Sequence, residues 1–108
     1  MRFELEQTCA ACPEQYDVYR GARQVGYIRL RNGYFYLSYQ DMYGERIYEH
    51  TFEDRLKGCF DSDEERDIYL KKSLEALKNK IICEMIDGDM FNVEYNIRWI
   101  RRSYMTLT

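Results

Sequence analysis

Proline, tryptophan and histidine are almost missing from this chain of 108 residues, which contains one of each. Long apolar runs are missing as well, since no stretch approaches the roughly 20 residues that a membrane-spanning helix needs. Residues 1–6 lack the apolar core that a secretion signal requires. We therefore expect a cytoplasmic protein with no membrane association.

A large excess of charge of one sign is also missing, because the formal net charge is only −3. Binding to long duplex DNA depends on many basic contacts to phosphates, so this balance excludes a general DNA-binding protein. Hydrophobic residues make up 45% and charged residues 32% of the chain, which excludes a disordered tail. At this length we expect one domain over residues 1–108.

Recognisable catalytic motifs are absent from the sequence. It contains neither the GxxxxGK[ST] loop nor the GxGxxG turn that bind phosphates. Asp87-Gly88-Asp89 lacks the further ligands of a calcium loop. The single histidine, His50, does not complete a Ser-His-Asp pattern, so we expect a non-enzymatic protein without a cofactor.

The four cysteines allow more than one interpretation, and they are Cys9, Cys12, Cys59 and Cys83. Disulfides are rare in a reducing cytoplasm, so we expect small half-buried cysteines at the first two positions and ordinary packing residues at the others. Structural zinc needs four ligands, usually from two close pairs, and here the second pair is missing. A zinc site of Cys9 and Cys12, completed by two of Cys59, Cys83 and His50, remains the less favoured alternative. A thioredoxin-like pair is disfavoured because Pro13 and a strand-like run follow the CxxC.

Short alternating segments bounded by turn residues predict a series of β-strands. They cover residues 3–8, 16–20, 24–31, 34–40 and 45–52. Asn32-Gly33 predicts a tight hairpin, because both central positions of the favoured turn need a positive φ. Residues 16–52 are therefore expected to form an antiparallel meander, with residues 3–8 as an edge strand.

One helix is expected after the meander. Ser62 and Glu65 have the spacing of a capping box, and a stripe of apolar residues follows at helical spacing: Leu70, Leu74, Leu77, Ile81 and Met85. Gly88 is the natural end of this helix. We expect an α+β fold in which an antiparallel sheet packs on one amphipathic helix over residues 1–87. Residues 88–108 should form an extension with one more strand, at residues 91–99.

The tight hairpin sorts its side chains onto two faces of the sheet, because side chains alternate along a strand. The helix-facing set is Ile28, Leu30, Phe35, Leu37 and Tyr39, and the opposite set is Tyr27, Arg29, Arg31, Tyr34 and Tyr36. If Leu37 pairs with Ile47, then Tyr48 and His50 join the second set. Tyr and Arg carry much of the binding energy at interfaces, although Tyr also simply stabilises exposed strands.

Acidic residues gather where the helix is expected to begin: Asp61, Asp63, Glu64 and Glu65. Acidic side chains stabilise a helix start by interacting with the helix dipole. The alternative is an acidic patch that contacts a basic groove on a partner, although mimics of nucleic acid usually carry more net charge.

Three segments carry a resemblance to other proteins: CPEQYDVY at residues 12–19, QVGYIRLR at 24–31 and GYF at 33–35. With the acidic helix start and the helix, this pattern resembles small uncharacterised proteins of bacteria, phages and other mobile elements. The resemblance covers residues 1–82 and carries no assigned activity. It implies a protein that binds a host protein by stoichiometric contact, for example an inhibitor of CRISPR nucleases or related host defences.

Other partners remain open at this point. Exposed aromatic residues interleaved with Arg can stack bases, so a nucleotide or a single-stranded nucleic acid is the alternative ligand. A small zinc-stabilised module is a weaker third interpretation. An edge strand and a Tyr-rich face permit a homodimer without requiring one.

Overall fold

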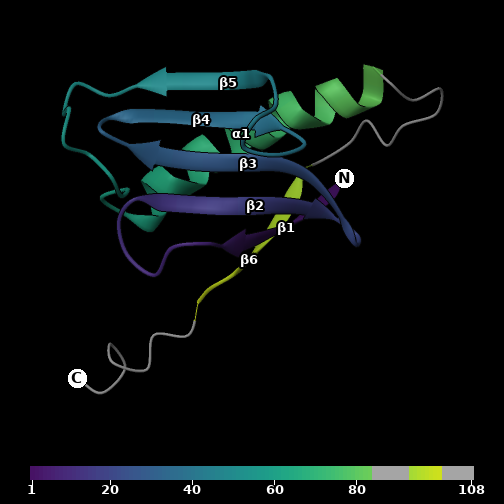
Figure 1. Ribbon diagram of the computed structural model, residues 1–108, viewed down its shortest axis with the longest axis horizontal. Helices are drawn as coiled ribbons and strands as arrows, with labels where there is room; N and C mark the ends of the chain where they lie inside the picture. Colours follow the sequence, from purple (N-terminus) through teal and green to yellow (C-terminus); the bar gives the residue numbers. More distant parts are fainter. Residues whose placement is uncertain (84–92, 101–108) are drawn as a thin grey trace.

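The computed structural model describes residues 1–83 and 93–100, in which six strands form one sheet and one helix packs against it (Figure 1). The strands are β1 (Arg2–Gln7), β2 (Glu14–Arg20), β3 (Arg23–Arg31), β4 (Tyr34–Tyr39), β5 (Arg46–Thr51) and β6 (Glu94–Arg98), and the helix is α1 (Asp63–Cys83). The expected α+β class is confirmed. The expected helix end at Gly88 and the start of the last predicted strand lie outside the described residues.

The sheet is open and has the strand order β5-β4-β3-β2-β1-β6. Strands β2 to β5 pair antiparallel with their neighbours in sequence, as the meander predicted, and β1 joins them antiparallel to β2. Strand β6 pairs parallel with β1, so the expectation that residues 3–8 form an edge strand is wrong. The edges are β5 and β6.

The β3–β4 hairpin has the register that Asn32-Gly33 predicted, with Arg31 opposite Tyr34 and Arg29 opposite Tyr36. Both turn residues have positive φ, 53° at Asn32 and 75° at Gly33, as this two-residue turn requires. A Cβ on Gly33 would lie 2.5 Å from the Asp54 carbonyl oxygen. Only glycine therefore fits under the loop that follows β5.

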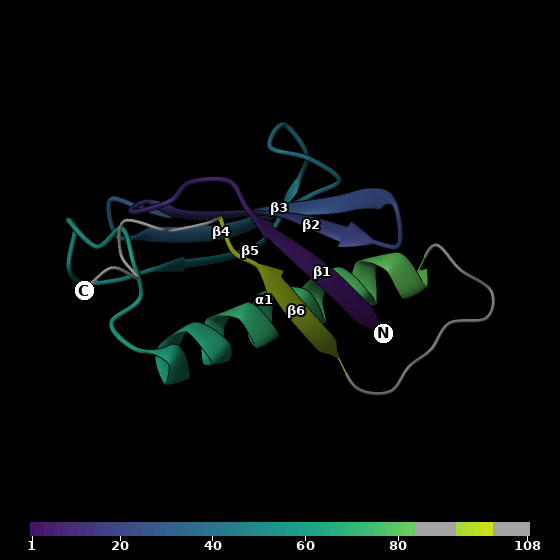
Figure 2. The ribbon, with the colours of Figure 1, turned by 90° about the horizontal axis from the view of Figure 1, so that it is seen from below.

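Helix α1 begins with the predicted cap, since the Glu65 amide donates to Ser62 Oγ at 3.0 Å. The Glu65 carboxylate accepts from the Asp61 amide at 2.9 Å, one residue before the expected partner. The helix lies on one face of the sheet (Figure 2). Gly26 of β3 allows this close approach, because a Cβ there would lie 3.3 Å from Leu77 Cδ2.

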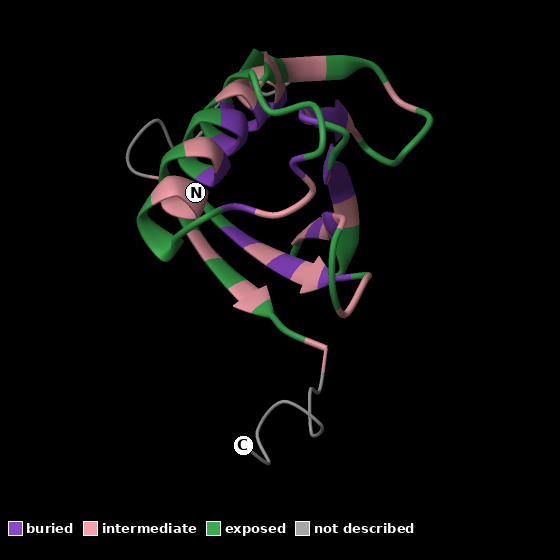
Figure 3. Ribbon diagram, turned by 90° about the vertical axis from the view of Figure 1, so that its left-hand side faces the viewer, coloured by how far each residue is buried: buried purple, intermediate pink, exposed green. Residues whose placement is uncertain are grey.

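The core lies between α1 and the sheet (Figure 3). Its fully buried apolar side chains are Phe3, Leu5, Tyr16, Val18, Ile28, Leu30, Phe35, Leu37, Leu70, Leu74 and Leu77. The predicted helix stripe is confirmed from Leu70 to Ile81, while Met85 lies outside the described residues. Among the residues that the structure describes, no helix is long and apolar enough to cross a membrane.

The expected register of β5 is wrong by one residue over most of the strand. Arg46 pairs with Ser38, and the register then shifts between Ser38 and Leu37, so that Leu37 faces Tyr48 and Phe35 faces His50. A bulge of this kind adds one residue to one strand, and a one-residue shift moves every later side chain to the other face. Tyr48 and His50 therefore belong with the core side of the sheet.

Candidate binding surface on the open sheet face

Tyr and Arg side chains gather over β3, β4 and β5 on the face of the sheet opposite α1. We call this group the Arg/Tyr surface. It consists of Tyr27, Arg29, Arg31, Tyr34, Tyr36 and Arg46. The hairpin register predicted the first five. Sequence reasoning did not name Arg46, although the expected pairing of Leu37 with Ile47 already puts it opposite Ser38 on this face, which is where it lies.

The tyrosines of this surface pack side by side instead of standing free. The ring of Tyr36 lies 5.3 Å from that of Tyr34 and 6.2 Å from that of Tyr27, measured between centroids. Tyr36 is only 6% exposed and Tyr27 only 7%. Burial also raises the pKa of Tyr27. These two rings form a rigid base and leave little free ring surface.

Arg46 lies across this base from the edge strand. Its guanidinium carbon is 4.3 Å from the ring centroid of Tyr36 and 5.4 Å from that of Tyr34. The Tyr34 hydroxyl accepts from Arg46 Nη1 at 3.2 Å and donates to the Glu49 carboxylate. A guanidinium stacked over an aromatic ring is held in place while its outer edge remains free to donate.

Arg29 and Arg31 have no ion-pair partner among the described residues, and Arg29 Nε is buried without a hydrogen-bond partner there. With Asn32, Tyr34, Tyr36 and Arg46 they line a shallow hollow of about 310 Å³. Exposed arginines are often solvated without any function. A buried guanidinium nitrogen without an acceptor is uncommon, because it loses its hydrogen bonds to water.

Tyr48 and His50 lie away from this surface, which corrects their assignment to it. His50 packs in an aromatic cluster with Phe52 and Tyr69, with ring centroids 4.6 and 4.8 Å away. Its Nε2 lies 3.4 Å from the Tyr69 hydroxyl. Tyr48 packs edge-on against Phe35 at 5.9 Å. Both side chains therefore help to join β5 to the core.

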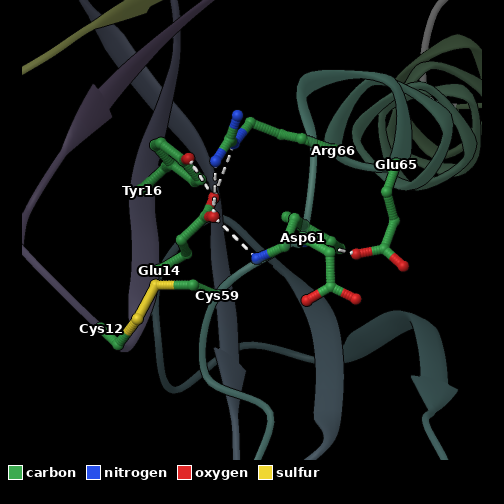
Figure 4. Close-up of a disulfide and its surroundings, with 8 residues drawn as sticks. Cys12, Glu14, Tyr16, Cys59, Asp61, Glu65 and Arg66 are labelled. Carbon is green, nitrogen blue, oxygen red and sulfur yellow. Dashed lines mark hydrogen bonds and ion pairs between the residues drawn. A yellow bond between two sulfur atoms is a disulfide. The ribbon is translucent and has the colours of Figure 1, made fainter.

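The cysteines differ from the expectation, because Cys12 and Cys59 form a disulfide with a Cα–Cα distance of 5.5 Å (Figure 4). The view of Cys59 as an ordinary packing residue is therefore wrong. Cys9 is free and half-buried, as expected. Cys83 is free but exposed, so it is not the packing residue that was expected, and Cys12 is exposed instead of half-buried. No group of three metal-ligating side chains occurs within residues 1–83 and 93–100. Sequence alone missed the pairing because 47 residues separate the two cysteines.

Next to the disulfide, a buried carboxylate joins the sheet to the start of α1 (Figure 4). Glu14 is 3% exposed and accepts from the Tyr16 hydroxyl at 2.6 Å, the Phe60 amide at 2.9 Å and Arg66 at 2.8 and 2.9 Å. Burial alone would raise the pKa of Glu14, but these donors outweigh it and hold that pKa below its usual value. Both oxygens of the Glu14 carboxylate therefore have hydrogen-bond donors, and the network holds β2 to the start of α1.

The acidic residues at the helix start are largely occupied by local partners. Lys57 pairs with Asp61 and Glu65, both at 3.0 Å, and Arg66 pairs with Asp63 at 2.6 Å. Lys57 has a side chain only 7% exposed, so its charge is held by these two carboxylates. Three of the four acidic residues, Asp61, Asp63 and Glu65, thus have a cation or a cap amide as partner, and Glu64 remains exposed.

Comparisons with known proteins return no match: no family model, no curated protein and no solved structure resembles this chain significantly. The surfaces described above are therefore the basis for any statement about function.

Proposed function

We propose that this chain is a non-enzymatic binding protein that holds an acidic partner protein on its Arg/Tyr surface. One observation carries the proposal: Arg29, Arg31 and Arg46 are gathered on a rigid tyrosine base, and among the described residues no ion pair is formed by any of the three. Two other cations of the molecule, Lys57 in the loop before α1 and Arg66 on α1, are by contrast paired with carboxylates.

The chemistry of the surface favours an acidic partner. Arginine and tyrosine are the residue types that most often dominate binding energy, and complementary charge speeds association and excludes wrong partners. The Tyr27 and Tyr36 rings are already packed against neighbours, so little ordering entropy remains to be lost on binding.

The narrower expectation, an inhibitor of a host defence nuclease carried by a phage or mobile element, rests on the resemblance alone and stays a prediction. The cytoplasmic location stays one as well. The Arg/Tyr surface gives the binding of a host protein a direct test, because a partner from a bacterial lysate should depend on it.

The experiment is capture from a bacterial lysate, followed by purification of the captured protein and measurement of its Kd with variants. Arg31→Glu with Arg46→Glu should weaken binding at least about tenfold. The matched control is Arg23→Glu, an exposed arginine at the other end of β3. Equal affinity of all variants would overturn the proposal, as would a loss of affinity in the control as large as in the double variant.

A further inference from the structure

The hollow in the Arg/Tyr surface is formed by side chains from three adjacent strands and one turn. Arg29 and Arg31 come from β3, Tyr34 and Tyr36 from β4, and Arg46 from β5, with Asn32 at the turn. Because β3 and β4 pair directly, Arg29 faces Tyr36 and Arg31 faces Tyr34. Residues two apart on a strand share a face, so the two β3 arginines point to the same side.

The lining of this hollow contains three positive charges and no carboxylate. Two larger hollows, of about 390 and 550 Å³, differ because Glu4 and Glu6 line the first and Asp67 and Glu94 line the second. A third, of about 490 Å³, also lacks a carboxylate but contains two arginines, Arg20 and Arg23, instead of three. A concave group of like charges concentrates the local potential. This hollow is therefore well suited to an anion.

The donors are partly fixed before any ligand arrives. The guanidinium carbon of Arg46 lies 4.3 Å from the Tyr36 ring centroid, and its Nη1 donates to the Tyr34 hydroxyl, so the position of this guanidinium is restricted. Arg29 Nε is buried and has no acceptor among the described residues. An oxygen acceptor brought by a ligand would remove that deficit, and charge-assisted bonds of this kind are among the stronger hydrogen bonds in proteins.

Charge and donor number favour a phosphoryl group over a carboxylate. A phosphate monoester carries a charge of about −1.5 to −2 and three acceptor oxygens, which matches three guanidinium groups. One carboxylate offers a single charge and two oxygens, and would leave an excess of positive charge in the hollow.

The aromatic rings argue against a nucleotide as the source of that phosphate. Stacking of a base needs an exposed ring face, whereas Tyr36 is covered by Arg46 and is 6% exposed. The Tyr34 ring packs 5.3 Å from that of Tyr36, and the Arg46 guanidinium carbon lies 5.4 Å from its centroid. A phosphoryl group without a base fits better, and protein side chains carry such groups.

We infer that the hollow between Arg29, Arg31 and Arg46 binds a phosphorylated side chain of the partner protein. This inference rests on the proposed function, since it specifies the chemistry that the Arg/Tyr surface recognises. Clusters of arginine are a recurrent means of recognising phosphorylated segments.

The test is titration of the whole chain with O-phosphoserine, O-phosphotyrosine, AMP and glutamate, followed by NMR of the arginine Nε–H signals. Both phosphoamino acids should shift the signals of Arg29, Arg31 and Arg46 and bind at least about tenfold more tightly than glutamate, since bonds to charged groups are individually strong. Each of Arg29→Gln, Arg31→Gln and Arg46→Gln should weaken that binding, and Arg23→Gln should not.

Three results would overturn the inference: no binding of either phosphoamino acid, binding of glutamate as tight as that of O-phosphoserine, or AMP as the tightest ligand. Failure of the proposed function looks different. If a captured partner needs the arginines but is unaffected by phosphatase treatment and by competing O-phosphoserine, the inference fails and the proposed function stands. If the partner binds without the arginines, the proposed function fails.

Discussion

On the face of the sheet that α1 covers, the buried carboxylate of Glu14 has all its hydrogen-bond partners, whereas on the opposite face the buried Nε of Arg29 has none among the described residues. Glu14 is buried on the covered face and receives hydrogen bonds from three residues. Arg29 on the open face has a buried nitrogen without a partner among the described residues. Both faces are made by the same strands, so the sheet itself does not cause this difference.

The comparison indicates how the two faces contribute to the molecule. Apolar burial under the helix supplies most of the stability, because burial of apolar area is the dominant favourable term in folding. The open face keeps its tyrosines ordered by packing them on one another. Its arginines can therefore be changed with little loss of stability, and binding and folding can be measured separately.

The largest expected effect comes from the covered face. Leu74 is fully buried on α1, and Leu74→Ala should lower the free energy of unfolding by about 4 kcal/mol through lost transfer energy and a residual cavity. Arg31→Ala on the open face should change it by less than about 0.5 kcal/mol. Urea denaturation measures both, and similar losses in the two variants would contradict the difference between the faces.

The disulfide should have the next largest effect, because it fastens the segment before β2 to the loop before α1. Reduction, or Cys12→Ser, should lower the free energy of unfolding by about 2–4 kcal/mol, since the bridge closes a long loop in the unfolded chain. Cys9→Ser is the matched control and should have little effect. Thermal melts with and without reductant measure this, and an unchanged midpoint on reduction would refute a stabilising disulfide.

The smallest expected effect is on the pH dependence of stability, to which one carboxylate on each face contributes. The pKa of Glu14 is lowered on folding, so its contribution to stability is present above the ordinary glutamate pKa and is lost as pH falls through the folded value. Burial, with Glu6 nearby, raises the pKa of Asp17 on the open face. Its contribution is full below the ordinary aspartate pKa and is lost as pH rises through the folded value.

Glu14→Gln should therefore lower the melting temperature most at neutral pH and least in acid. Asp17→Asn should raise the melting temperature slightly at neutral pH and leave it unchanged in acid, while its oxygen can still accept from Gln24. Melting curves recorded from about pH 3 to pH 8 span both ordinary pKa values. Shifts of the same sign in the two variants at neutral pH would contradict the assignment.

Much of the fold could be predicted because its rules act over short distances. The Asn32-Gly33 turn gave the β3–β4 register, and the stripe from Leu70 to Ile81 gave the buried side of α1. Five residues of the Arg/Tyr surface followed from that register. The errors occurred where a position depends on distant partners, as at Tyr48 and His50, whose face depends on a bulge against β4.

The sequence by itself determined the strands, the helix cap and the alternation that separates Leu30 from Arg31, because each depends on neighbours only a few residues away. Only the tertiary structure decided that Cys12 meets Cys59, that β6 lies parallel to β1, and that Arg46 lies over Tyr36. Those contacts join segments far apart in the chain. Their free energy depends on the packing of the whole sheet on α1, which no local pattern encodes.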